Sequence, residues 1–356
     1  MLDRLTLEGV LVANVVFVGF TALLFVGTRF FPGREYRGVP LPDGTQVTYK
    51  LNGLWLFVAI LALLIGGAFT TLYSLSYLRD HFVELFIAAN VFSFVFSAIL
   101  YARGPEKDKG LIRGFWLGTE LNPNWWGVDL KVFSYRPSLY GLALFNVAFA
   151  FAQYERYQTI SLQMWLYQGM TLFYLLSSFQ FEHGMLSMFD VIEERFGFML
   201  VWGDYAVVPF FYCIPGYFLI DQPESIPLPL ALGLVALFVF GFWMFRGANA
   251  QKNRFKANPE APIWGKRPET IDGRLLVSGF WGIGRKLNYT GEILVYLSFT
   301  IPAGLVSPWA FALPLWLASL LVHRAWRDDK RCRSKYGAMW DKYCARARFR
   351  MLPFIY

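Results

Sequence analysis

Charged residues are scarce in this sequence of 356 residues. Asp, Glu, Lys and Arg together make up 16%, whereas hydrophobic residues make up 56% and the mean hydropathy is +0.40. A soluble globular protein carries about 25% charged residues. The deficit argues against two or three soluble domains of ordinary composition and predicts one all-α polytopic membrane protein.

Cysteine and histidine are also scarce, with three residues of each. Cys213, Cys332 and Cys344 have neither metal-ligand nor disulfide spacing, so we expect packed or surface thiols. The histidines are too few and too scattered to suggest a metal centre, and we expect no metal site. Because the sequence has no P-loop and no GxGxxG after a strand, any nucleotide must be held by something other than a Rossmann unit.

Long apolar runs are abundant. A membrane-spanning helix needs about 20 mostly apolar residues, because the bilayer core offers no water to backbone groups. The stretches that qualify are 9–31, 54–76, 82–102, 140–153, 159–180, 197–220, 226–246 and a pair between 289 and 323. We therefore predict nine to ten transmembrane helices. The first run is too long for a signal-peptide core and is expected to stay in the membrane.

Basic residues gather towards the C-terminus. Ten Lys and Arg accompany three Asp between Arg324 and Arg350, and a second basic stretch runs from Arg246 to Lys286. Basic loops stay cytosolic, so both stretches and the C-terminus are expected on the cytosolic side. The charges could serve topology and anionic lipid alone, but the Asn, Gln, Asp, Tyr and Trp among them also favour a soluble, multiply anionic ligand. Nucleic acid is not expected, because no recognised module is present.

Two basic segments place polar residues on one helical face. In "HRAWRDDKRCRSKYG" these are Arg324, Asp328 and Tyr336, recurring at multiples of four residues. An Arg–Asp pair one turn apart is either a plain surface salt bridge or, at a membrane helix end, a partly desolvated functional pair. In "RGANAQKNRFK" Lys252 and Lys256 lie one turn apart, which suits a phosphate group. The alternative is that these lysines extend to lipid headgroups.

Acidic residues lie near apolar helix ends. They are Glu182, Asp190 and Asp204. Ionisable groups inside a membrane are costly and usually functional. Residues in loops would not carry this cost, so both interpretations stay open.

The motifs together resemble a known family, the sterol reductases of the C-14, C-7 and C-24(28) type, which includes the membrane domain of the lamin B receptor. The similarity runs from about residue 118 to the C-terminus. The segments that carry it are "GTELNPNWWGVDLKVFSYRP", "FGFMLVWGDYAVVPF", "RGANAQKNRFK", "LLVSGFWGIGRKLNY" and "HRAWRDDKRCRSKYG…WDKYC". The segment "PLPDGTQVTYKLNGL" at 40–54 also looks like a lumenal part of the family.

The resemblance implies NADPH-dependent reduction of a sterol carbon–carbon double bond, by protonation and then hydride transfer. It implies one membrane sterol reductase domain over 1–356, with N-terminal helices in 1–117, sterol-pocket helices in 118–245 and an NADPH-binding half in 246–356. The sterol would come from the bilayer and NADPH from the cytosol, which requires a nucleotide pocket on the cytosolic side. The implied setting is a multi-pass protein of the endoplasmic reticulum or a bacterial inner membrane.

The resemblance also assigns site residues. The cofactor-binding residues are Asn249, Lys252, Lys256, Leu276, Trp281, Arg285, Asn288, Tyr289, Arg324, Asp328, Lys335 and Tyr336. The proton donor is expected to be Tyr174, supported by Asp328, with Glu182 as a further catalytic candidate. A tyrosine titrates near 10, so it is protonated at neutral pH and able to donate. A packed core Tyr174 without a catalytic role is the alternative.

Some positions depart from the pattern of ring reductases. Ser177 and Phe181 stand where an Asp and an Asn are usual, and "RKLNYT" differs from the usual Arg-His-Pro-Asn-Tyr-Leu. These departures favour reduction of the C-24(28) double bond in the sterol side chain, whereas "WGD" at 202–204 and Asn288 favour ring reduction at C-14 or C-7. We predict the side-chain reaction, with the ring reaction as the alternative. Further alternatives are an isoprenylcysteine-type methyltransferase and a non-catalytic sterol-binding membrane protein.

Overall fold

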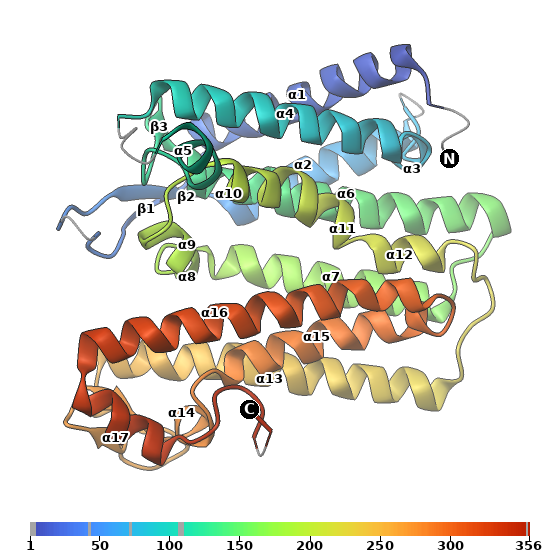
Figure 1. Ribbon diagram of the computed structural model, residues 1–356. Helices are drawn as coiled ribbons and strands as arrows, with labels where there is room; N and C mark the ends of the chain where they lie inside the picture. The colour runs from blue at the N-terminus through green and yellow to red at the C-terminus, as the bar shows by residue number, and fades with distance from the viewer. Residues whose placement is uncertain (1–4, 42–43, 71–72, 106–109, 354) are drawn as a thin grey trace. The chain divides into compact units, whose positions relative to one another are not determined.

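The chain is helical along most of its length (Figure 1). A computed structural model describes residues 5–41, 44–70, 73–105, 110–353 and 355–356. The chain forms two compact units, of which the first comprises Met1–Ile160 with Gln168–Pro223 and the second Ser161–Tyr167 with Glu224–Tyr356.

The first unit is built from long helices with short helical pieces between them. The long helices are α1 (Leu7–Phe30), α2 (Gly53–Phe69), α4 (Phe82–Arg103), α6 (Leu130–Tyr157) and the greater part of α7 (Leu162–Gln180). The short helices are α3 (Ser76–Asp80), α5 (Leu111–Leu117), α8 (Glu182–Met185), α9 (Phe189–Ile192), α10 (Phe198–Trp202), α11 (Val208–Phe211) and α12 (Ile214–Leu219). Two small antiparallel pairs complete it: β1 (Arg34–Arg37) with β2 (Thr48–Leu51), and β3 (Asn124–Trp125) with β4 (Val128–Asp129).

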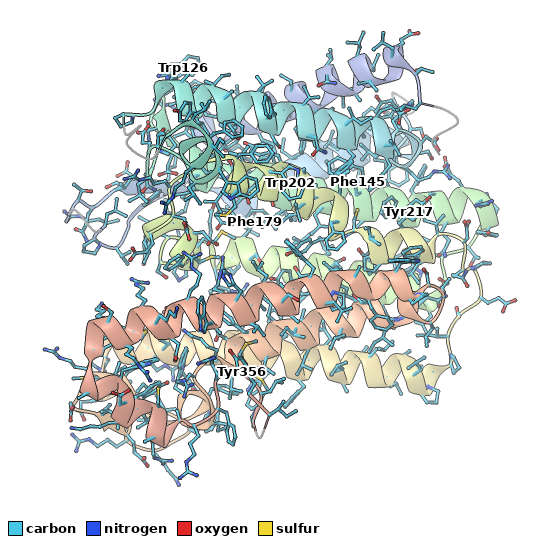
Figure 2. All side chains as sticks on the ribbon, in the orientation of Figure 1. Trp126, Phe145, Phe179, Trp202, Tyr217 and Tyr356 are labelled. Carbon is cyan, nitrogen blue, oxygen red and sulfur yellow. The ribbon has the colours of Figure 1, made fainter. Side chains whose placement is uncertain are left out.

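Aromatic rings fill the interior of the first unit. Phe145 of α6 lies with its ring centroid 5.1 Å from that of Phe82 and 4.7 Å from that of Phe210. Phe149, one turn further along α6, meets Tyr217 of α12 edge-on at 5.6 Å. Figure 2 labels Phe145 and Tyr217 on their two helices. Such tilted and edge-to-face pairs add to the stabilisation that burial alone provides.

The second unit contains three long helices, two short helices and a small strand pair. Its helices are α13 (Leu228–Ala257), α14 (Phe280–Ile283), α15 (Leu287–Gly304), α16 (Ala312–Tyr336) and α17 (Ala338–Arg346). A 3₁₀ turn, Pro308–Phe311, joins α15 to α16, and β5 (Thr270–Ile271) pairs with β6 (Leu275–Leu276) in the segment after α13. Figure 1 shows α13, α15 and α16 side by side.

The predicted apolar stretches all contain helices, and four of the described helical runs are long and apolar enough to cross a membrane. These runs are Leu7–Phe30, Phe82–Arg103, Phe198–Leu219 and Leu228–Ala257. The helix observed in the predicted span 54–76 is shorter than expected, since α2 ends at Phe69. Residues 71–72 of this span lie outside the described part. The region 289–323 holds parts of two helices, α15 and α16, as the predicted pair required. The chain is therefore a helical protein with four candidate membrane-spanning segments in its described part, while the total of nine to ten spans stays a prediction.

Glycines allow α13 and α15 to approach closely. A Cβ atom added at Gly291 of α15 would lie 2.5 Å from the backbone nitrogen of Phe245 and 2.6 Å from the carbonyl oxygen of Gly241. A Cβ at Gly241 would in turn lie 2.9 Å from the carbonyl oxygen of Gly291. Small residues at facing positions let membrane helices pack backbone against backbone. This contact fixes the distance between the C-terminal half of α13 and the start of α15.

The first prediction concerns Gly291→Ala. Alanine normally stabilises a helix interior by about 1 kcal/mol relative to glycine, but here the methyl group has no room and the helices must separate. We expect a net loss of about 1–3 kcal/mol, measured as a lower midpoint of thermal unfolding of the purified protein in detergent.

Gly233→Ala is the matched control for this prediction. Gly233 also lies in α13, but a Cβ there would meet no heavy atom within 4 Å. The control variant should be as stable as the wild type or more so. Equal stability of the Gly291→Ala and Gly233→Ala proteins would contradict the close approach.

Candidate functional site

All the cofactor-binding residues predicted from the sequence lie in the second unit. The close contact of α13 with α15 brings Asn249 opposite Asn288, whose amide nitrogen donates to the Asn249 side-chain oxygen at 3.3 Å. Asn249 itself donates to the carbonyl of Phe245, one turn earlier in α13, at 3.0 Å. The side-chain oxygen of Asn288 is buried and accepts no hydrogen bond from the described residues. A buried acceptor without a donor calls for an explanation, and a bound ligand supplies one.

Trp281 and Lys252 form a second part of this cluster. The Trp281 indole N–H donates to the carbonyl of Ala248 at 2.8 Å, which fixes the ring against α13. The Lys252 ammonium lies 4.9 Å from the centroid of that ring and is exposed. Leu276 packs in the same hydrophobic cluster as Trp281. The arrangement presents a cation and an aromatic surface together.

Lys286 and Asp328 form an almost buried ion pair. The Lys286 ammonium donates to Oδ2 of Asp328, with 11% and 23% of the two side chains exposed. Burial opposes ionisation of the Asp328 carboxyl, but Lys286 outweighs this effect and holds the pKa of that carboxyl below its ordinary value. Asp328 is therefore ionised at neutral pH. Lys286 ends the second basic stretch and lies in the "RKLNYT" segment, but it was not among the predicted cofactor-binding residues, and no spacing rule links it to a residue on α16.

Arg285 is held by the C-terminal segment. Its guanidinium donates to the carbonyl oxygens of Ala347 at 2.8 Å and Arg348 at 3.1 Å, and its Nε lies 3.5 Å from Oδ1 of Asp329. Arg350 approaches the other Asp329 oxygen at 3.2 Å. These contacts fasten the chain after α17 to the start of α15. A direct contact of Arg285 with a nucleotide stays a prediction.

The remaining predicted cofactor residues surround this cluster. Tyr289 lies next to the ion pair, with its ring centroid 5.8 Å from the Lys286 ammonium. Lys335 lies 5.4 Å from the ring of Tyr336, at the end of α16. The last two, Lys256 and Arg324, are on α13 and α16, and Lys256 is exposed.

Tyr343 was not among the predicted site residues. It is buried on α17, and its hydroxyl donates to the carbonyl of Trp281 at 3.3 Å. The sequence offered one signal, since Tyr343 follows Tyr336 by seven residues and returns near the same face of a continuous helix. The contact itself depends on the break at Gly337, where φ is +53°.

The catalytic candidates Tyr174 and Glu182 lie in the first unit. Tyr174 is half-buried on α7, and its carbonyl accepts a hydrogen bond from Ser178 at 2.9 Å. The hydroxyl of Ser177 is buried and has no hydrogen-bond partner in the described part of the chain. Ser177 is the position where ring reductases usually carry an Asp.

Glu182 uses both of its carboxylate oxygens within the first unit. Oε1 lies 3.0 Å from the guanidinium of Arg136, and Oε2 accepts the backbone N–H of Gly53 at 3.0 Å. Arg136 also donates to the Thr28 hydroxyl at 2.6 Å, and Tyr140 donates to the carbonyl of Gly53 at 2.7 Å. The Glu182–Arg136 pair is almost completely buried and ties the ends of α1 and α2 to α6 and α8.

Sequence comparison relates this chain to known proteins. The chain matches the profile described as the Ergosterol biosynthesis ERG4/ERG24 family over residues 8–356. It is 37% identical over 352 residues to a Delta(14)-sterol reductase of Arabidopsis thaliana, covering 96% of this chain and 95% of that protein. It is 35% identical over 353 residues to a Delta(14)-sterol reductase of Methylotuvimicrobium alcaliphilum, covering 95% and 83%. A third relative, Delta(14)-sterol reductase TM7SF2 of Mus musculus, is 37% identical over 348 residues, covering 94% and 83%.

The second prediction concerns the buried pair of Arg136 and Glu182. Glu182→Ala should lower the free energy of unfolding by about 3–5 kcal/mol, because it leaves the Arg136 charge buried without a counter-ion. Replacing both residues by Met should cost less than Glu182→Ala alone. The measurement is the thermal unfolding midpoint in detergent.

An exposed pair serves as the control. Arg267 and Glu260 contact at 3.0 Å, but 80% and 69% of their side chains are exposed. Glu260→Ala should leave the unfolding midpoint unchanged, because exposed pairs contribute little. A Glu182→Ala protein as stable as Glu260→Ala would contradict the structural role of the buried pair.

Proposed function

This chain belongs to the Ergosterol biosynthesis ERG4/ERG24 family of sterol reductases, and we propose that it reduces the C-14 double bond of a sterol ring with NADPH as the hydride source. The enzyme class follows from the family. The ring position is supported by the three relatives described above, which share 35–37% identity along almost the whole sequence and are named Delta(14)-sterol reductases. These names favour the ring alternative over the C-24(28) reaction that Ser177 and the "RKLNYT" segment had suggested. They give no support to a methyltransferase.

The residues of the second unit fit an anionic dinucleotide. The observation that carries this assignment is the cluster of Lys252, Trp281, Asn288 and Asp328, which combines an exposed cation, an aromatic face, a buried acceptor without a donor and an ionised carboxylate. Cations suit phosphates, and the acceptors suit sugar hydroxyl and amide N–H groups. NADPH would supply the hydride that completes the reduction.

The remaining cofactor-binding assignments are part of the same proposal. Lys256 and Arg324 would add positive charge around the phosphates. Leu276, Tyr289, Arg285, Lys335 and Tyr336 would border the nucleotide. The contacts of Arg285 with the C-terminal segment favour an indirect role for this residue, through the position of residues 347–349.

We assign proton donation to Tyr174. A neutral phenol is able to protonate an alkene that becomes a carbocation, and aromatic faces stabilise the positive charge that develops. Asp328 cannot donate, because its carboxyl is ionised at neutral pH and paired with Lys286, and it would support the site as a hydrogen-bond acceptor. Both oxygens of Glu182 are engaged, which supports a positioning role for this residue over proton transfer.

The membrane arrangement is proposed on the distribution of charge. With nine to ten spans, the basic stretches from Arg246 to Lys286 and from Arg324 to Arg350 would lie in the cytosol, where NADPH is available. The chain would form one reductase domain of the endoplasmic reticulum or of a bacterial inner membrane. The sterol would enter from the bilayer.

The third prediction tests the position of the reduced bond. The protein is expressed in two yeast strains, one without its C-14 sterol reductase and one without its C-24(28) sterol reductase. Gas chromatography–mass spectrometry of extracted sterols should show loss of the ring double bond in the first strain and no change in the second. Loss of the side-chain double bond alone would refute the C-14 assignment, and an immunoblot of membranes controls for expression.

The fourth prediction separates binding from chemistry. Lys252→Ala should raise the KM for NADPH about 10- to 100-fold with little change in kcat, since a charge-assisted hydrogen bond is worth about 1.5–3 kcal/mol. Tyr174→Phe should leave this KM unchanged and lower kcat about 10²-fold or more. Steady-state kinetics with membranes or purified enzyme measure both.

Lys266→Ala is the control for the charge change, because Lys266 is an exposed cation of the same unit. Its kinetics should match those of the wild type. An unchanged KM in Lys252→Ala would remove Lys252 from the nucleotide site, and an unchanged kcat in Tyr174→Phe would remove Tyr174 from proton donation.

A further inference from the structure

Lys286 differs from Lys252 and Lys256, the predicted phosphate-binding lysines, because its ammonium already forms an almost buried ion pair. Its ammonium contacts Oδ2 of Asp328, and it is only 9% exposed, whereas Lys252 and Lys256 are exposed. Lys286 is the residue immediately before α15, and Asp328 is near the end of α16. The pair therefore joins two helices at the place where the nucleotide site is proposed.

The carboxylate of Asp328 would be harmful to nucleotide binding if it stood alone. A free negative charge close to bound phosphates would repel them, and it would also compete with the phosphates for the ammonium of Lys252. Electrostatic effects of this kind are stronger for partly buried groups than for exposed ones, because the effective dielectric constant around them is lower than in bulk water. Lys286 removes both effects, since it neutralises Asp328 locally.

The contact also determines how Asp328 is oriented. Oδ2 receives the Lys286 ammonium and lies 4.0 Å from the thiol of Cys332, which is one turn further along α16. Oδ1 receives no hydrogen bond from the described residues and stays available as an acceptor. The Lys252 ammonium is meanwhile placed over the ring of Trp281. The Lys286 ammonium thus holds the Asp328 carboxylate in place, whereas the Lys252 ammonium remains available to bind an anion.

We propose that Lys286 is a positioning residue that controls nucleotide affinity through Asp328, by neutralising and orienting its carboxylate, and that it does not itself bind the phosphates. This inference rests on the proposed function, in which the second unit binds NADPH. It adds a residue that the predicted cofactor set did not include. It also distinguishes two roles for lysines that the sequence presents as equivalent basic residues.

The fifth prediction is a double-mutant cycle. Lys286→Met should weaken NADPH binding at least tenfold, because it leaves Asp328 charged and unpaired beside the phosphates. Asp328→Asn keeps an acceptor oxygen and removes the charge, so the double variant Lys286→Met/Asp328→Asn should bind NADPH more tightly than Lys286→Met alone. Isothermal titration calorimetry with purified protein in detergent gives the Kd without requiring turnover.

Salt dependence gives a second readout that a purely structural role would not change. Because the defect in Lys286→Met is electrostatic, the difference in Kd from the wild type should shrink between low salt and about 0.5 M salt. Lys286→Arg keeps the charge and should bind NADPH nearly as the wild type does. Lys342→Met removes an exposed lysine that pairs with Asp272 at 3.4 Å in the same unit, and it should bind normally.

The outcomes separate this inference from the proposed function. A double variant that binds as weakly as Lys286→Met would show that Lys286 contacts the nucleotide directly, and would overturn the positioning role. Wild-type affinity in Lys286→Met would overturn it as well. A wild-type protein that does not bind NADPH would refute the proposed function and this inference with it. If Lys286→Met does not fold, Lys286→Gln with the same Asp328→Asn partner provides the cycle.

Discussion

The close approach of α13 and α15 at Gly241 and Gly291 is the constraint on which the candidate nucleotide site depends. Backbone atoms of the two helices occupy the space that side chains would otherwise fill, so the helices cannot slide apart without losing this contact. One to two turns beyond it, Asn249 meets Asn288, and Trp281 lies against α13. A cluster built from separate segments thus takes its geometry from two residues that have no side chain.

Buried charges are treated in the same way in both units. In the first unit, Glu182 has both oxygens engaged, by Arg136 and by a backbone N–H. In the second unit, Asp328 is paired with Lys286, and Asp329 lies between Arg285 and Arg350. Each of these buried carboxylates is paired with a cation, because an unpaired buried charge is costly. The two carboxylates differ in their remaining ability to accept hydrogen bonds. Both oxygens of Glu182 are occupied, whereas Asp328 keeps one oxygen available.

The helical class and the approximate location of the helices could be predicted from apolar runs. The predicted run 82–102 corresponds to α4, Phe82–Arg103, and the two helices between 289 and 323 are α15 and α16. The early end of α2 could not be predicted, because Gly66 and Gly67 stand within an apolar run that continues past them. The apolarity of a segment indicates that it favours lipid, but it does not indicate at which residue the helix ends.

The sequence by itself determined the family and the reaction class, because the order of several polar motifs between apolar helices is specific and needs no coordinates. It also located the basic residues that suit an anionic cofactor. Only the tertiary structure decided which of these residues are already paired. Lys286 meets Asp328 across 42 positions of the sequence, and Arg136 meets Glu182 across 46. Such pairs depend on the distance between helices, which side-chain volume and facing glycines set, and the linear pattern of charges does not contain that distance.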